Sequence, residues 1–242
     1  MPNDISAITH ELKTLGFSFR SGSQIQNIVN EKFFGMKFER FSSSWETLGI
    51  DRYLADGGRY RRRRFAVFQI TKNKIIRKAH QPHYQSRDFN PVNGGIQRHF
   101  LPITNMVGEH PVFLNLIELT RKIFFAASNT NNSSAKWHTE VHQFRVEANN
   151  VELGLPTPEG MHRDGVDWVC VLLIKRHNVE SGVTQIIDCD NKERSEFILE
   201  NPFDCVFLND HRVHHGVTPI SLVDKNSDGF RDILVVTYKE EN

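Results

Sequence analysis

The chain has 242 residues, enough for one domain with a sizeable core, and its 30 basic and 29 acidic residues give a formal net charge of +1. This near-neutral balance supplies no whole-molecule field for nucleic acid or for an anionic membrane, so we expect neither as a partner. The first residues lack the basic and apolar segments of a signal peptide, and no stretch is long enough to span a bilayer, so we expect a cytoplasmic protein. Three cysteines without a CxxC pair indicate reduced thiols and argue against a zinc site built from cysteine.

The first third of the chain shows helical patterns and then a strand pattern. Apolar residues recur at helical spacing over 5–15, and a second helix is expected within 24–38. Residues 59–68 favour a strand, in which alternation divides a run of arginines between two faces. In a near-neutral protein a solvated face explains these charges better than phosphate binding does. A further hypothesis is that one of Arg61 to Arg64 binds the substrate carboxylate, with Arg62 and Arg64 as the chosen candidates.

The middle of the chain predicts a helix and then a long strand. Residues 111–125 carry apolar side chains at the spacing of an amphipathic helix. As a strand, residues 137–148 place Glu140 and His142 on one face, which becomes apolar toward its end. His142 is therefore expected to point into the interior of the fold, either lining a ligand pocket or bonding a backbone group as a core histidine.

Two histidines and one aspartate give the strongest functional signal. In an extended segment the side chains of His162 and Asp164 project from the same face, and a buried strand is expected directly after them at 166–174. His215, with His214 as its rival, follows later in the chain. Two imidazoles and one carboxylate on one face of an octahedral Fe(II) leave three positions open, which is the arrangement of an oxygenase site. A short H-x-D string also arises by chance, so the surrounding sequence has to decide between a metal site and a chance match.

A strand expected over 231–238 supplies that context. Arg231, Ile233 and Val235 share one of its faces, which places a guanidinium among apolar neighbours near the third candidate ligand. The planar fork of arginine can donate two parallel hydrogen bonds to a carboxylate, whereas lysine offers only a point charge. The alternative is an ordinary ion pair with a surface acid. The order of histidine, aspartate, histidine and arginine favours an anion anchor beside a metal.

This order resembles that of the Fe(II)- and 2-oxoglutarate-dependent dioxygenases, and more narrowly that of the bacterial L-isoleucine hydroxylases. The narrower resemblance is carried by residues 141–145, 162–164, 215–219 and 230–237. It implies that His162, Asp164 and His215 bind Fe(II). It also implies that Arg231 holds the distal carboxylate of 2-oxoglutarate. The position before Gly-Val-Thr-Pro favours His215 over His214 as the third ligand.

The resemblance further implies an all-β core, a double-stranded β-helix or jelly roll, with N-terminal and flanking helices. We expect a single dioxygenase domain over 1–242, in which 1–135 supply helices and supporting strands and 136–242 supply the metal-binding barrel. O2 is then the second cosubstrate, and a free L-amino acid is the implied substrate, hydroxylated with release of succinate and CO2. In this interpretation His142 lines the cosubstrate pocket and Trp168 contributes to the substrate pocket.

The sequence leaves the substrate open. Where the isoleucine hydroxylases have a tyrosine and an aromatic residue, this chain has Val146 and Gly160, at positions expected to affect a cosubstrate hydrogen bond and the substrate pocket. A peptide or protein hydroxylase would need an extended groove, and a cupin-like barrel would bind a metal or ligand without turnover. Arg231 argues against the cupin-like alternative, because a barrel that only binds needs no anion clamp beside its metal.

Overall fold

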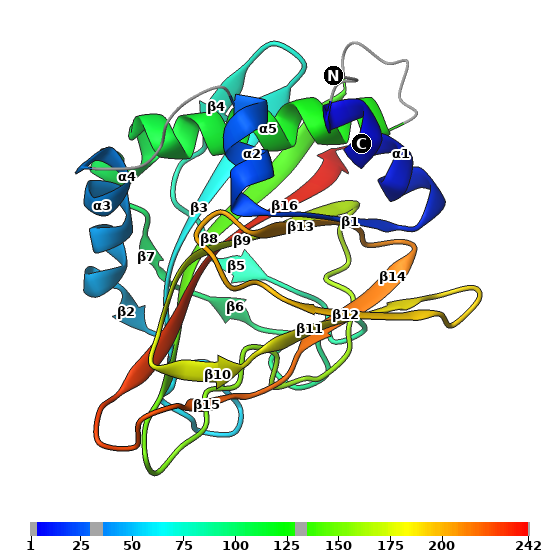
Figure 1. Ribbon diagram of the computed structural model, residues 1–242. Coiled ribbons are helices and arrows are strands. Elements are labelled where there is room, and N and C mark those ends of the chain that lie inside the picture. The colour runs from blue at the N-terminus through cyan, green and yellow to red at the C-terminus, as the bar shows by residue number, and fades with distance from the viewer. Residues whose placement is uncertain (1–3, 30–35, 129–134, 242) are drawn as a thin grey trace.

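The computed structural model describes residues 4–29, 36–128 and 135–241, and two facing β-sheets dominate the fold (Figure 1). The helices are α1 (Asp4–Thr14), α2 (Gly22–Val29), α3 (Met36–Ser42), the 3-10 helix η1 (Ser43–Thr47), α4 (Asn105–Gly108) and α5 (Pro111–Ala127). The strands of the first half are β1 (Phe17–Arg20), β2 (Gly49–Ile50), β3 (Arg61–Thr71), β4 (Ile75–Arg77), β5 (His83–Tyr84), β6 (Gln97–Arg98) and β7 (Leu101–Pro102). The strands of the second half are β8 (Lys136–Ala148), β9 (Trp168–His177), β10 (Val179–Ser181), β11 (Val183–Asp188), β12 (Arg194–Ile198), β13 (Cys205–Asn209), β14 (Val213–Val217), β15 (Ile220–Leu222) and β16 (Gly229–Glu241).

The large sheet brings both halves of the chain together. In the described part of the chain it has nine strands, with β1-β13-β9-β16-β8-β3-β2 as its main path and β4 and β7 paired with β3. Strand β8 pairs antiparallel along its whole length with β16 on one side, and with β3 on the other. The register sets Arg61, Val146 and Arg231 side by side across these three strands. Because side chains alternate between the faces of a strand, this register fixes which residues share the inner face.

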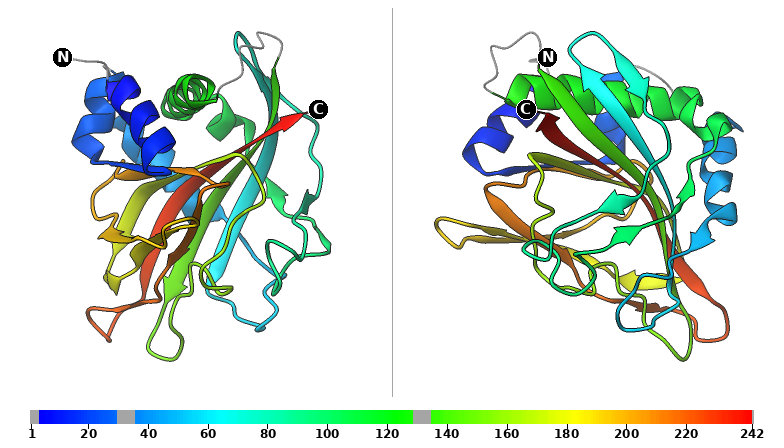
Figure 2. Two further views of the ribbon diagram at one scale, coloured as in Figure 1. Left: turned by 90° about the vertical axis from the view of Figure 1, so that its right-hand side faces the viewer. Right: turned by 180° about the vertical axis from the view of Figure 1, so that it is seen from behind.

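The small sheet closes the barrel. It has the order β12-β11-β14, and the pair β10-β15 lies beside it. Both lie on the face of the large sheet that the helices leave free (Figure 2). Two antiparallel sheets packed in this way form the double-stranded β-helix that the sequence predicts, and the prediction of an all-β core with N-terminal and flanking helices is confirmed.

Helices α1, α2 and α5 cover the outer face of the large sheet, and the main hydrophobic core lies between them and the sheet (Figure 2). Helix α5 begins at Pro111, whose fixed φ suits the first helical position, and it buries Phe113, Ile117 and Phe124 completely. Leu234 and Val236 of β16 face this core. Their neighbours along the strand therefore face the space between the two sheets. No helix in the described residues is long and apolar enough to cross a membrane.

The predicted elements can now be compared with the observed ones. The helices expected at 5–15 and 111–125 are confirmed as α1 and α5. The strands expected at 59–68, 137–148, 166–174 and 231–238 correspond to β3, β8, β9 and β16. The helix expected within 24–38 corresponds to α2 and the start of α3, and residues 30–35 lie outside the described part of the chain.

Candidate active site

A cavity of about 340 Å³ lies between the two sheets. Strands β3, β5, β6, β8, β9, β14 and β16 line it, together with loop residues from 85–90 and 156–166. Part of its wall is apolar and includes Val169, Val171, Ile233 and Val235. The remaining wall carries histidines, carboxylates and arginines. Its volume and mixed lining are those of a site for a small molecule.

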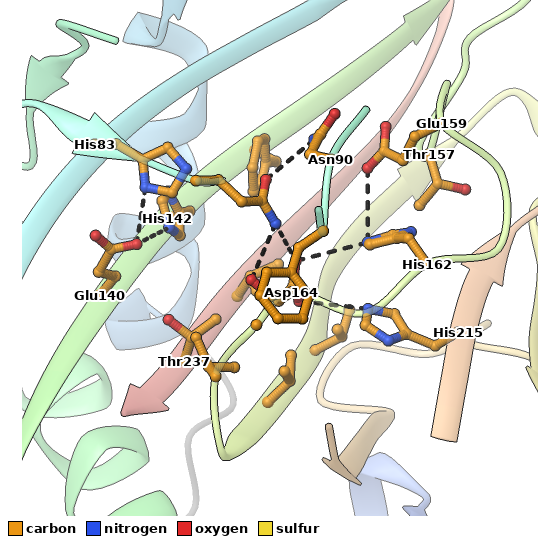
Figure 3. A pocket seen from close by; sticks show the side chains of 18 of the residues that line it. His83, Asn90, Glu140, His142, Thr157, Glu159, His162, Asp164, His215 and Thr237 are labelled. Carbon is orange, nitrogen blue, oxygen red and sulfur yellow. Dashed lines mark hydrogen bonds and ion pairs between the residues drawn. The ribbon is translucent and has the colours of Figure 1, made fainter. Parts of the chain in front are cut away.

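His162, Asp164 and His215 meet at one side of this cavity (Figure 3). One ligand atom from each lies within 4.8 Å of the other two. Asp164 Oδ1 lies 3.6 Å from His162 Nε2, and its Oδ2 lies 3.5 Å from His215 Nε2. All three side chains are largely buried, which excludes bulk water from the group. The geometry that the sequence predicts for the three residues is therefore present.

Backbone pairing explains why the two imidazoles meet. His162 forms an isolated antiparallel bridge with His215, in which each backbone N–H donates to the other residue's carbonyl, at 3.0 and 2.9 Å. Directly opposed residues carry their side chains on the same face, and the two rings lie 4.6 Å apart, centre to centre. Asp164 lies in the loop before β9 and not in a continuous strand, so the expected extended segment is correct for His162 only.

The hydrogen bonds around His162 leave the correct nitrogen free for a metal. Nδ1 of His162 donates to the carbonyl of Gly160 at 3.0 Å, so Nε2 faces Asp164. Burial lowers the pKa of His162, but the hydrogen bond and charge of Asp164 outweigh burial and raise that pKa to about 9. The same contacts lower the pKa of Asp164 well below its usual range, against the effect of burial. A divalent cation would replace the proton held between these groups, so the donor set fits a metal such as Fe(II).

Asp210 holds the loop that carries Asp164. Its carboxylate accepts hydrogen bonds from the backbone N–H groups of Asp164, Gly165 and Val166, at 2.9, 2.8 and 3.1 Å. Gly165 has φ of +79°, and a Cβ there would lie 2.4 Å from the ring of Phe89, so the turn needs glycine. No sequence pattern points to Asp210, because it reaches the site from the turn between β13 and β14.

We expect Asp210→Ala to weaken Fe(II) binding, because it leaves three partly buried N–H groups of the ligand loop without their acceptor. Loss of such outer contacts typically costs about 10- to 100-fold in metal affinity. The Fe(II) affinity of the variant is measured by titrating the purified protein with Fe(II) under anaerobic conditions. Asp190→Ala is the control, since Asp190 is exposed and its side chain makes no contact with the site. Equal iron affinity in the two variants would contradict the positioning role of Asp210.

Arg231 lies within the same cavity and has no partner for its charge. It is fully buried, and none of its three side-chain nitrogens has a hydrogen-bond partner. Burial, with a smaller contribution from Arg176, lowers its pKa to about 9. An unpaired buried guanidinium is costly unless an anion joins it, so Arg231 is a candidate to bind an anionic group in the cavity that the candidate metal ligands also line.

A second cluster of His83, Glu140 and His142 also lines the cavity (Figure 3). His83 Nδ1 donates to Glu140 at 2.8 Å, and His142 Nε2 lies 3.5 Å from the same carboxylate oxygen. Arg63 lies 2.7 Å from Nδ1 of His142 and can only donate there, so Nδ1 accepts and Nε2 carries the proton. Burial, followed by the charge of Arg63, lowers the pKa of His142 to about 3. The positive charge of Arg63 beside both imidazoles disfavours a metal cation in this cluster, and the cluster places His142 in the cavity.

The structure corrects the substrate roles expected for Arg62, Arg64 and Trp168. Arg62 pairs with Glu147 at 2.7 Å on the outside of the sheet, and Arg64 donates to backbone carbonyls at the edge of the sheet. Trp168 faces the helices, where its ring stacks on Phe124. None of the three lines the cavity. On β3 the inward arginines are the alternate ones, 61 and 63.

His214 also lies away from the cavity. Its Nδ1 is 3.3 Å from Sγ of Cys189, on the opposite side of β14 from His215. Alternation along this strand therefore separates the two neighbouring histidines, and only His215 joins His162 and Asp164.

Comparison with known proteins adds a family and several relatives. A family model described as 2OG-Fe dioxygenase matches residues 42–237. The L-isoleucine-4-hydroxylase of Bacillus thuringiensis is 28% identical over 161 residues, which are 65% of this chain and 66%, slightly less than two thirds, of that protein. The 3(1)-hydroxy-L-isoleucine 4-dioxygenase of Pantoea ananatis is 24% identical over 241 residues, covering 96% of this chain and 94% of that protein.

Solved structures agree with these sequence matches. A crystal structure of a bsmA homolog from Methylobium petroleophilum aligns with a TM-score of 0.88 and 31% identity, covering 97% of this chain and 92% of that chain. The crystal structure of IDO from Bacillus thuringiensis aligns with a TM-score of 0.82 and 20% identity, covering 98% and 100% of the two chains, which supports the fold.

Proposed function

Because the chain belongs to the 2OG-Fe dioxygenase family, whose members use Fe(II), 2-oxoglutarate and O2, we propose that it hydroxylates the side chain of a free L-amino acid, releasing succinate and CO2. We also propose that the whole chain acts as one dioxygenase domain. The observation that carries the proposal is the pairing, in one cavity, of a His-Asp-His cluster with a buried arginine that lacks an anion.

The metal would be held by Nε2 of His162, a carboxylate oxygen of Asp164 and Nε2 of His215. These three donors are the two-histidine, one-carboxylate set that non-haem iron oxygenases use. When bound, Fe(II) supplies the open coordination positions on which the chemistry of this family depends. Asp210 and the carbonyl of Gly160 would hold the ligands in place, by fixing the loop of Asp164 and the ring orientation of His162.

Arg231 would hold the distal carboxylate of 2-oxoglutarate. Its planar fork can donate two parallel hydrogen bonds, and the guanidinium is fully buried, so the interaction is stronger than at a surface. Val146, beside Arg231 in the sheet, offers no hydroxyl to the cosubstrate. The guanidinium therefore supplies the anchoring without a neighbouring tyrosine.

The nature of the substrate is supported by the relatives and by the cavity wall. Both curated relatives are named for L-isoleucine or a hydroxylated L-isoleucine. The valine and isoleucine side chains of β9 and β16 provide an apolar surface for a branched aliphatic side chain. A cavity of this volume suits a free amino acid better than a folded protein partner. The protein's part is to hold the substrate C–H bond in place and to exclude water, because a displacement of ~1 Å can cost about a hundredfold in rate.

We expect Fe(II) and 2-oxoglutarate to bind together under anaerobic conditions and to give a weak visible charge-transfer band. With O2 admitted, a screen of free L-amino acids should then show substrate-dependent succinate release. Tight zinc binding together with no band from iron would contradict the metal site. A band without succinate release from any amino acid would contradict the substrate class but not the cofactor assignment.

A further inference from the structure

Two charged side chains of the cavity, Arg98 and Glu159, lack a permanent counter-charge, because no described carboxylate lies within ion-pair distance of Arg98 and Glu159 faces only the imidazole of His162, which is neutral when it binds a metal. The first is Arg98 of β6, which is 2% exposed and lines the cavity. Its Nε has no hydrogen-bond partner, and its terminal nitrogen reaches only Oε1 of Gln85, at 3.4 Å. In the described part of the chain no carboxylate lies within ion-pair distance of it. Burying a guanidinium in this way is costly unless an anion joins it.

The second is Glu159, in the loop that precedes His162. Its side chain is 8% exposed, and its Oε2 is buried without a partner. Its Oε1 lies 3.6 Å from Nε2 of His162, so the carboxylate stands beside the metal group and also lines the cavity (Figure 3). A buried carboxylate with a free oxygen is the complement of Arg98, because it requires a cation or a donor.

The other charges of the cavity are already satisfied. Arg61 pairs with Asp51 at 2.8 Å, and Arg63 lies 3.6 Å from the same carboxylate. Glu140 is surrounded by three histidines, which contact both of its oxygens. Lys239 donates to a backbone carbonyl at the rim, at 3.0 Å. Arg231 is the anchor proposed for the cosubstrate. In the described residues this leaves Arg98 and Glu159 as the cation and the anion that await a ligand.

We infer that Arg98 binds the α-carboxylate of the substrate and that Glu159 binds its α-ammonium group. This inference rests on the proposed function and deepens it, since it specifies the feature by which the cavity recognises a free amino acid. Opposite charges on the two side chains match a zwitterion and neither a dicarboxylate nor a diamine. Each peptide bond removes one of the two charges, so a residue within a protein chain has neither and would leave both buried groups unpaired.

The electrostatics of Arg98 agree with this pairing. Burial and then the charge of Arg61 lower the pKa of Arg98, while the carboxylates of Asp51 and Glu159 oppose that change. The carboxylate of Glu159 therefore lies close enough to affect the guanidinium but does not form an ion pair with it. Gln85 links Arg98 to the metal group, because its amide nitrogen donates to the carbonyl and carboxylate of Asp164, at 3.2 and 3.3 Å. Gln85 therefore fixes the position of Arg98 relative to the candidate metal ligand Asp164.

The first test uses the unaltered protein loaded with Fe(II) and 2-oxoglutarate under anaerobic conditions. The ligands are the amino acid that releases most succinate in the screen above, its 2-hydroxy acid and its carboxamide. The hydroxy acid lacks the ammonium group, and the carboxamide lacks the carboxylate. Calorimetric titration should show each analogue binding at least about 30-fold more weakly than the amino acid, the size expected when a buried charge loses its partner. If the hydroxy acid bound as tightly as the amino acid, the role of Glu159 would be overturned. If the carboxamide did so, the role of Arg98 would be overturned.

The second test assigns each charge to its residue. Arg98→Gln should lose the preference for amino acid over carboxamide, and Glu159→Gln the preference for amino acid over hydroxy acid. Arg62→Gln and Glu147→Gln are matched controls, since that pair lies outside the cavity. Retention of the anaerobic charge-transfer band in the variants shows that the metal and cosubstrate sites are intact. Variants that keep the band and also keep the ligand preferences of the unaltered protein would overturn the inference but not the proposed function. Absence of the band in the unaltered protein would overturn both.

Discussion

Arg231→Lys should raise the 2-oxoglutarate concentration needed for half-maximal turnover by about 30-fold or more, with little change in the requirement for the amino acid. Lysine keeps the positive charge but cannot donate two parallel hydrogen bonds to a carboxylate. Its shorter reach also leaves part of the buried space around residue 231 empty. Arg231→Ala should be worse, because the bound carboxylate would then be buried without the guanidinium that neutralises its charge.

The measurement is the dependence of succinate release on 2-oxoglutarate, made in parallel with Fe(II) affinity. Iron affinity should barely change, because Arg231 contacts none of the candidate metal ligands. Arg62→Lys is the control, since Arg62 is half exposed and outside the cavity. A variant that changed amino-acid preference but left the 2-oxoglutarate dependence untouched would place Arg231 in the substrate site. Arg98 would then be the first alternative anchor for the cosubstrate.

Sequence could predict the parts of this site that lie on single strands with a clear alternation. Side chains two positions apart on one strand point to the same face. The sequence therefore predicted that Arg231, Ile233 and Val235 share a face, and all three line the cavity. The order of the candidate ligands can be read directly along the chain. The fold class came from the resemblance to the dioxygenase family that this order carries.

The arginine run shows where such reasoning stops. Alternation predicts that β3 divides its arginines between two faces, but not which face lies inward. Both faces of this strand become apolar: Phe65 and Val67 lie on one side, and Phe68 and Ile70 on the other. Because both faces are buried, the hydrophobic pattern cannot tell which face of β3 points into the cavity. The sequence interpretation chose Arg62 and Arg64, whereas the structure places residues 61 and 63 in the cavity wall. Strand β9 is also buried on both faces at its start, so the sequence could not show that Trp168 faces the helices.

Residues that reach the site from distant segments were not predictable at all. Gln85, Arg98 and Asp210 come from a loop, a two-residue strand and a turn, where no periodicity indicates a direction. Their roles depend on tertiary contacts, such as the three backbone N–H groups that Asp210 accepts. Only the assembled fold brings them beside the metal ligands.

His162→Ala, Asp164→Ala and His215→Ala should each abolish turnover, since each removes one of three donors and leaves the metal too few protein ligands to be retained. Iron content after gel filtration and the anaerobic charge-transfer band should fall together with succinate release. His214→Ala should retain measurable activity, because its ring contacts Cys189 and not the cavity. The comparison is well matched, as the two histidines are neighbours on one strand and differ mainly in the face that they occupy.

His214 also controls for damage to the fold. Replacing either histidine leaves the backbone pairing of β14 with β11 in place, so both variants should unfold at similar temperatures. A loss of turnover confined to His215→Ala then reflects a missing metal ligand rather than a weakened strand. The reverse ranking, with His214→Ala inactive and His215→Ala active, would require β14 to present its other face to the cavity. That shift would also break the bridge between His162 and His215, so it would contradict the register of the small sheet as well as the ligand assignment.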